Sequence, residues 1–344
     1  MPRALILAGA GAVPMVVGML TMMPVAGQAP TTVTRKISAE AYTPPRTPDR
    51  QPDLQGFWTN ATYTPLERPD NVTKAFYTPE EAAEVEKRAA AREREQTAPG
   101  TVADVHYDFT QFALDRSQST LAHNLRTSLI VDPPNGKLPP LSAVGQRRAA
   151  ASAEEAKRRG GRWDSAENNQ LDDRCIIMAG AGPPMLDAGY NSNYQIVQAP
   201  DYVMILVEMI HDFRVIPLDG RPEPPSNVRH WMGIPRGRWD GNTLVVETTN
   251  FNGKNPFRGS SENVRVTERF TRVSESSIRY TFTLDDEATW SRPWTGELNM
   301  EKTGGPIFEH ACHEGNYGLY NTLVGARLEE KKATEEAKKG STLR

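Results

Sequence analysis

Four side chains in the C-terminal half of the sequence have the chemistry for proton transfer. They are His211, His230, Glu268 and Tyr280. An imidazole is the usual proton carrier near neutral pH, and a carboxyl group held in apolar surroundings titrates closer to neutrality than an exposed one. We expect these four residues to converge on one cavity and to act there as acids and bases.

Strand periodicity is the reason for grouping two of these residues. Successive side chains of a β-strand alternate between its two faces. Glu268 has the same phase as the apolar residues of segment 264–270, and Tyr280 has the phase of the apolar residues of segment 278–284. Both side chains are therefore expected to face an apolar interior.

His211 and Glu247 extend this pattern. His211 keeps the phase of the apolar residues between 203 and 213, provided that no bulge intervenes, and Glu247 shares a face with Val245. Because a carboxylate in an apolar interior needs a partner, the alternative is that Glu268 and Glu247 form structural ion pairs. The candidate partners are Arg214, Arg238 and Arg269.

Side chains suited to binding a substrate gather in two segments. Segment 230–239 contains Gly and Pro and is expected to be a loop, in which indole rings suit aromatic ligands and guanidinium groups suit phenolates. The alternative is that its tryptophans plug one end of a barrel. Segment 309–317 is rich in His, Cys and Glu, but its spacing fits no usual zinc pattern, so we expect no metal there. The expected substrate-binding residues are Trp231, Arg238, Trp239, Glu247, Trp294, His313 and Tyr317.

The chain has two cysteines, Cys175 and Cys312. In an oxidising compartment such a pair tends to form a disulfide. We expect that bond here, and the alternative is a pair of free thiols.

The first 29 residues have the composition of an export signal. Arg3 is the only charged residue before Arg35, and the apolar stretch between them ends in small residues before Gln28. We therefore expect a signal peptide over 1–29, a periplasmic or secreted protein, and no stable membrane insertion after cleavage. The alternative is a membrane anchor. Residues 30–50 are rich in Thr, Pro and Arg, which predicts an extended linker.

Residues 51–325 are expected to form a single β-barrel domain with helical insertions. Their β-branched and aromatic runs, separated by polar turns, are typical of an antiparallel meander. Because no βαβ alternation is present, we expect a mainly β fold, a lipocalin-like or calycin-like barrel. The N-terminal region is expected to be irregular and helical, with helices over 78–94 and 142–159, and residues 326–344 to form a charged tail. The expected strands are 194–198, 202–209, 213–217, 243–251, 264–273, 277–284 and 297–300.

Composition and missing motifs exclude several functions. The net charge is −3, from 43 acidic and 40 basic residues, so we expect no nucleic-acid partner. The sequence has no Gly-x-Ser-x-Gly elbow, no P-loop, and no Gly-x-Gly-x-x-Gly after a predicted strand. Acid–base chemistry without a cofactor, or simple binding, remains.

Four stretches of the sequence resemble a known protein family. They are GRWDGNTLVVETTNF at 237–251, VTERF at 266–270, RPWT at 292–295 and CHEGN at 312–316. The family is a large one of exported proteins from soil and environmental bacteria, and the resemblance extends over roughly residues 50–325. One activity associated with proteins of this type is the ring-opening phenylcoumaran lyase of lignin-dimer catabolism. The resemblance implies this reaction class and assigns no residue roles.

These observations together predict a lyase that needs no cofactor. Its substrate would be a small hydrophobic aromatic molecule, a lignin-derived dimer whose cyclic aryl ether is opened by acid–base elimination. One alternative is a non-catalytic periplasmic carrier of hydrophobic small molecules. Another is a metal-dependent hydrolase.

Overall fold

The fold described here belongs to one unit of the chain, which runs over Ala41–Arg344. The computed structural model describes residues 42–93, 120–178 and 180–342. The expected signal peptide over 1–29 lies outside the described residues.

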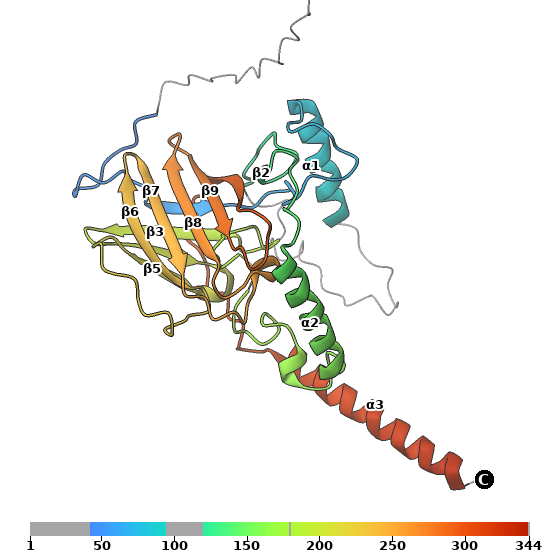
Figure 1. Cartoon of the computed structure of the whole chain (residues 1–344). Coiled ribbons are helices and arrows are strands. Elements are labelled where there is room, and N and C mark those ends of the chain that lie inside the picture. Colours follow the sequence, from blue (N-terminus) through green and yellow to red (C-terminus); the bar gives the residue numbers. More distant parts are fainter. Residues whose placement is uncertain (1–41, 94–119, 179, 343–344) are drawn as a thin grey trace, which may run out of the picture. The chain divides into compact units, whose positions relative to one another are not determined.

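Strands dominate the described part of the chain, where ten of them form one antiparallel sheet. Their bounds are β1 Gly56–Thr59, β2 Ile130–Asp132, β3 Asn193–Ala199, β4 Tyr202–Val207, β5 Phe213–Pro217, β6 Ile234–Asp240, β7 Thr243–Thr249, β8 Arg265–Arg272, β9 Ser277–Asp285 and β10 Trp294–Lys302. The order across the sheet is β5-β4-β3-β1-β10-β9-β8-β7-β6, and β2 pairs with β10. Figure 1 shows β6 to β9 side by side.

The two end strands of this sheet, β5 and β6, lie next to each other. No hydrogen-bonded ladder joins them within the described residues. The sheet is therefore nearly closed into a barrel, which confirms the expected mainly β, antiparallel barrel fold.

Three α-helices accompany the barrel in the described residues. They are α1 Pro79–Glu93, α2 Ala143–Arg159 and α3 Tyr317–Thr342. At the start of α1, Thr78 Oγ1 accepts a hydrogen bond from the Glu81 amide and Glu81 Oε2 accepts one from the Thr78 amide, which is a capping box. Ser142 caps α2 in a similar way by accepting from the Gly145 amide. None of the described helices is both long enough and apolar enough to span a membrane.

The barrel interior follows the alternation predicted for β8 and β9. In β8 the residues Val266, Glu268 and Phe270 are buried, and they stand opposite Leu284, Phe282 and Tyr280 of β9. These side chains belong to one continuous apolar cluster, apart from Glu268. The sequence pattern therefore predicted correctly that Glu268 and Tyr280 face the interior.

The predicted loop over 230–239 is wrong for most of its length, because residues 234–240 form strand β6. The sequence of this segment does not predict a strand, because Pro235 and Gly237 normally disfavour sheet structure. Both are tolerated because β6 is an end strand that pairs with β7 on one side only. Gly237 also allows β5 and β6 to approach each other closely. A Cβ atom at this position would lie 2.7 Å from side-chain carbons of Ile216 and Leu218. The contact between β5 and β6 is thus made by side chains that pack against the backbone of Gly237, in place of a hydrogen-bonded ladder.

Gly296 in β10 offers a test of the interior packing. A Cβ atom at this position would lie 2.2 Å from Cζ of Phe282, its cross-strand neighbour. We expect Gly296→Ala to lower the free energy of unfolding by about 1–3 kcal/mol, because the buried ring must move into occupied space. Urea unfolding measures this, and Gly304→Ala is the matched control because nothing lies within 4 Å of its added methyl. Equal stabilities of the two variants would contradict the packing described.

Candidate functional site

Three polar side chains meet inside the barrel. Arg214 of β5 forms a two-pronged ion pair with Glu268 of β8, with Nη1 and Oε1 2.9 Å apart and a second contact between Nη2 and Oε2. The Tyr280 hydroxyl donates to Glu268 Oε1 over 2.8 Å. The exposed fractions of the two charged side chains are 2% and 0%, so the pair is shielded from bulk solvent.

Both oxygens of Glu268 are therefore engaged. Burial, and then the negative charge of Glu268, raise the pKa of Tyr280 well above its usual value, so the phenol keeps its proton and donates it. Of the four residues expected to act as acids and bases, the structure brings together Glu268 and Tyr280. Their arrangement is that of the alternative in which Glu268 forms a structural ion pair with Arg214.

The two histidines, His211 and His230, lie outside the strands of the barrel. β4 ends at Val207, and a 3₁₀ turn over Met209–His211 contains Ile210 with a φ of 62°, so the alternation of β4 does not continue into β5. The phase expected through His211 is therefore wrong. Phe213, on that phase, is 57% exposed.

His230 is exposed, and its backbone is held to the segment that directly follows β7. Its amide donates to the Asn250 carbonyl, and its own carbonyl accepts from the Asn252 amide. It does not line the cavity described below.

Arg238 and Glu247 lie on the outer face of the barrel. In β7 the residues Leu244, Val246 and Thr248 oppose interior residues of β8, so Glu247 points outward and the expectation of an inward Glu247 is wrong. Its Oε1 is 3.0 Å from Arg238 Nη1. This is again the structural ion pair considered as the alternative.

The other expected binding residues divide between core and surface. Trp294 is fully buried and packs edge-on against Phe282 and Trp290, with ring centroids 5.8 Å and 5.6 Å away. Trp239 is half-buried. His313 and Tyr317 are exposed near the start of α3. Trp231 is the one member of this set that lines the cavity described next.

A cavity of about 540 Å³, called here the end cavity, lies where β8 begins and β9 ends. Its barrel side consists of Val264, Val266 and Leu284. Its other walls come from Trp231 and from two irregular segments, residues 170–187 (of which 179 is not described) and residues 251–261. Glu268, Tyr280 and Arg214 do not line it.

Most of the end cavity's walls are apolar or aromatic, including Trp231, Phe251 and Phe257. Three charged residues lie on its lining, Asp172, Asp187 and Arg258. The Asp187 carboxylate accepts hydrogen bonds from the Thr62 and Gly189 amides and from the Ser192 hydroxyl. Asp172 is half-buried, and its carboxylate accepts one hydrogen bond, from the Asp173 amide over 2.9 Å. Arg258 is exposed and forms no ion pair or hydrogen bond with another described residue. The cavity therefore combines aromatic surface with two carboxylates and a guanidinium that has no partner within the described residues.

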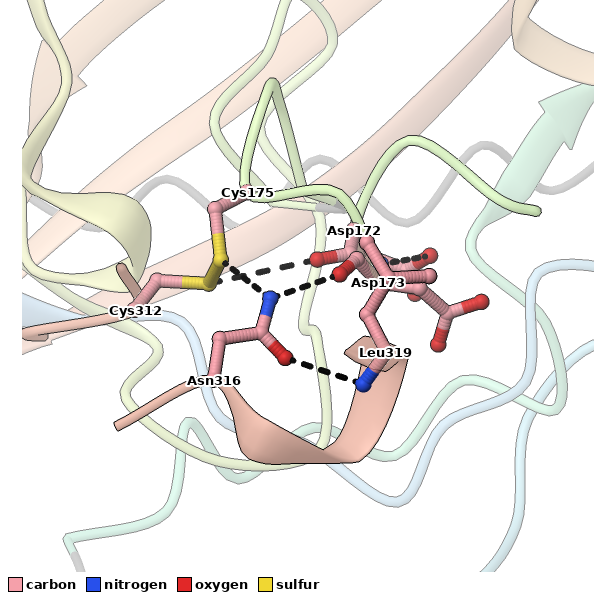
Figure 2. The surroundings of a disulfide bond; sticks show 6 residues. All are labelled: Asp172, Asp173, Cys175, Cys312, Asn316 and Leu319. Carbon is pink, nitrogen blue, oxygen red and sulfur yellow. Dashed lines mark hydrogen bonds between the residues drawn. A yellow bond between two sulfur atoms is a disulfide. The ribbon is translucent and has the colours of Figure 1, made fainter. Parts of the chain in front are cut away.

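A disulfide anchors the wall that carries Asp172 (Figure 2). Cys175 and Cys312 are bonded, with Cα atoms 5.7 Å apart, which confirms the predicted pairing. Asn316 reinforces the link, since its Nδ2 donates to the Asp173 carbonyl over 2.9 Å. The segment before α3 thus holds residues 170–175 in place.

Apart from Trp231, the residues of the end cavity were missed because irregular segments carry no periodic signal. Asp172 lies three positions before a cysteine expected to be cross-linked, and that proximity was the available clue. Arg258 lies in a 3₁₀ turn over Phe257–Gly259 and has a φ of 52°, a conformation that the sequence does not predict for an arginine.

Comparisons of the chain with protein-family models, with curated proteins and with solved structures found no match. Within the described residues, no three or more His, Cys, Asp or Glu side chains are grouped as metal ligands would be.

Proposed function

We propose that this protein binds an aromatic small molecule in the end cavity and breaks a cyclic aryl ether bond in it. The observation that carries the proposal is the lining of the cavity, where Trp231, Phe251 and Phe257 accompany Asp172 and Arg258. Cavities of roughly 300–1,000 Å³ with apolar walls and a few polar groups typically hold drug-sized ligands. A two-ring lignin-derived dimer falls within that range.

The reaction needs one base and one cation. The Asp172 carboxylate takes a proton from the carbon next to the benzylic carbon, and the freed electron pair forms a carbon–carbon double bond. The benzylic carbon–oxygen bond breaks at the same time, and its electrons leave on the oxygen as a phenolate. Arg258 stabilises that negative charge. Return of the proton to the phenolate completes a ring opening that yields a stilbene, with no atom lost and no oxidant consumed.

A phenylcoumaran with a free para-phenol tests this proposal. We expect the wild-type protein to convert it to a stilbene, followed by ultraviolet absorbance, and Asp172→Asn to lower turnover by about 10²-fold through loss of the base. Asp173→Asn is the matched control, because the Asp173 carboxylate pairs with Arg162 and does not line the end cavity. Absence of turnover by the wild-type protein would overturn the proposed reaction, and absence of binding as well would overturn the proposed site.

The same assay separates the lyase from a carrier of aromatic molecules. A carrier would bind the phenylcoumaran in the end cavity with no stilbene formed, and Arg258→Gln would weaken that binding while Asp172→Asn would not abolish it. We further propose that the protein works in an oxidising compartment outside the cytoplasm, a proposal supported by the cross-link between Cys175 and Cys312.

A further inference from the structure

Residues 180–187 form one wall of the end cavity without belonging to a helix or a strand. Gly180, Gly182 and Leu186 of this wall face the cavity, whereas Met185 is fully buried and packs into the barrel core. Among the described residues, no strand pairing joins this wall to the sheet. Some other set of contacts must therefore set its position.

Hydrogen bonds between the backbone of the wall and buried side chains supply those contacts. The Met185 amide donates to the Tyr280 hydroxyl over 2.9 Å, and the Met185 carbonyl accepts from Asn60 Nδ2 over 3.1 Å. At the beginning of the wall, the Tyr194 hydroxyl donates to the Gly180 carbonyl over 2.9 Å. The interior of the barrel thus holds the wall by its backbone.

The ion pair between Arg214 and Glu268 determines the direction of the hydrogen bond between Met185 and Tyr280. Arg214 holds the Glu268 carboxylate, and that carboxylate accepts the hydrogen bond from the Tyr280 hydroxyl. The phenol proton therefore points toward Glu268. The oxygen of the phenol is then left with its lone pairs toward the Met185 amide. Hydrogen bonds arranged in such a chain strengthen one another in a medium of low dielectric constant.

We propose that Tyr280 is a positioning residue, through which the buried Arg214–Glu268 pair sets the wall over 180–187 and thereby the shape of the end cavity. The inference rests on the proposed function in that the cavity holds a ligand. It gives the buried pair a role in binding although neither charge touches the cavity. The aromatic ring of Tyr280 has separate contacts, with ring centroids of Phe270 and Phe282 at 4.9 Å and 5.7 Å, so the hydroxyl can be removed alone.

The test is Tyr280→Phe, read first by hydrogen exchange. We expect exchange of peptides covering 180–187 to rise by about 10-fold or more, because the Met185 amide loses its acceptor, while peptides of β8 and β9 keep their protection. Tyr202→Phe is the matched control, since its hydroxyl accepts from Arg221 at the surface. Unchanged exchange over 180–187 would overturn the proposal, and so would an equal rise in all peptides, which indicates lost stability alone.

The second reading is affinity for 8-anilinonaphthalene-1-sulfonate, an aromatic anion, measured by its fluorescence. We expect Tyr280→Phe to weaken binding by about 10-fold and Tyr202→Phe to leave it unchanged. A loosened wall with unchanged affinity would overturn the link to the cavity's shape. Failure of the wild-type protein to bind the probe would count against the proposed function instead, and hydrogen exchange would still decide whether Tyr280 positions the wall.

Discussion

Glu268→Gln is expected to lower the free energy of unfolding by about 3–5 kcal/mol. The substitution removes the only carboxylate that contacts Arg214 among the described residues and leaves a guanidinium, 2% exposed, without a counter-charge inside the barrel. An uncompensated buried charge costs far more than the net contribution of the pair that it came from. Urea unfolding at neutral pH measures the loss.

Two comparisons make this result specific to burial. Glu247→Gln removes a carboxylate from the outer ion pair with Arg238, whose side chains are 36% and 60% exposed, and should cost no more than about 1 kcal/mol. The double variant Arg214→Met with Glu268→Leu should be more stable than Glu268→Gln alone, since no charge then remains buried. Equal stabilities of Glu268→Gln and Glu247→Gln would contradict the buried pair.

Loss of the disulfide is expected to lower the free energy of unfolding by about 4–5 kcal/mol. Cys175 and Cys312 are 137 residues apart in sequence, so their bond removes a large loop entropy from the unfolded chain. Unfolding with and without a reducing agent measures the effect. The double variant Cys175→Ser with Cys312→Ser should have the same free energy of unfolding as the reduced protein, and this free energy should not change when the reducing agent is added.

The same experiment reports on the cavity. Because the bond also anchors the segment that carries Asp172, the folded double variant should bind the aromatic probe more weakly than the oxidised protein. Thiol titration of the unfolded, unreduced wild-type chain should find no free thiol. Two free thiols, or a midpoint that does not respond to reduction, would contradict the cross-link.

The sequence predicted the barrel interior best where one rule decides both burial and orientation. Strict alternation in β8 and β9 located Glu268 and Tyr280 correctly, because each strand has one face against the core. The same rule failed at His211, since a turn with a left-handed residue at Ile210 resets the phase between two strands. Phase can be read within a strand and is lost across an irregular connection.

Other features of the site depend on contacts that sequence reasoning could not supply. Strand β6 contains Pro235 and Gly237, which suit a position at the end of the sheet that becomes known only from the topology. The end cavity joins residues 170–187 to residues 251–261, two irregular segments brought together by tertiary packing alone. The cysteines were an exception, because a long-range pairing follows when two thiols share an oxidising compartment.

The ion pair between Arg214 and Glu268 also links the two sides of the barrel across the gap between β5 and β6, which no backbone hydrogen bonds close in the described residues. Arg214 belongs to β5, one end of the sheet, and Glu268 belongs to β8, two strands from the other end, so the pair is a crossbar over the gap between β5 and β6. Unpaired strand edges are templates on which a second chain can add a strand and begin aggregation. To expose these two edges, the barrel must pull apart a buried, fully bonded salt bridge. We therefore expect this buried pair to oppose the addition of a second chain at these edges.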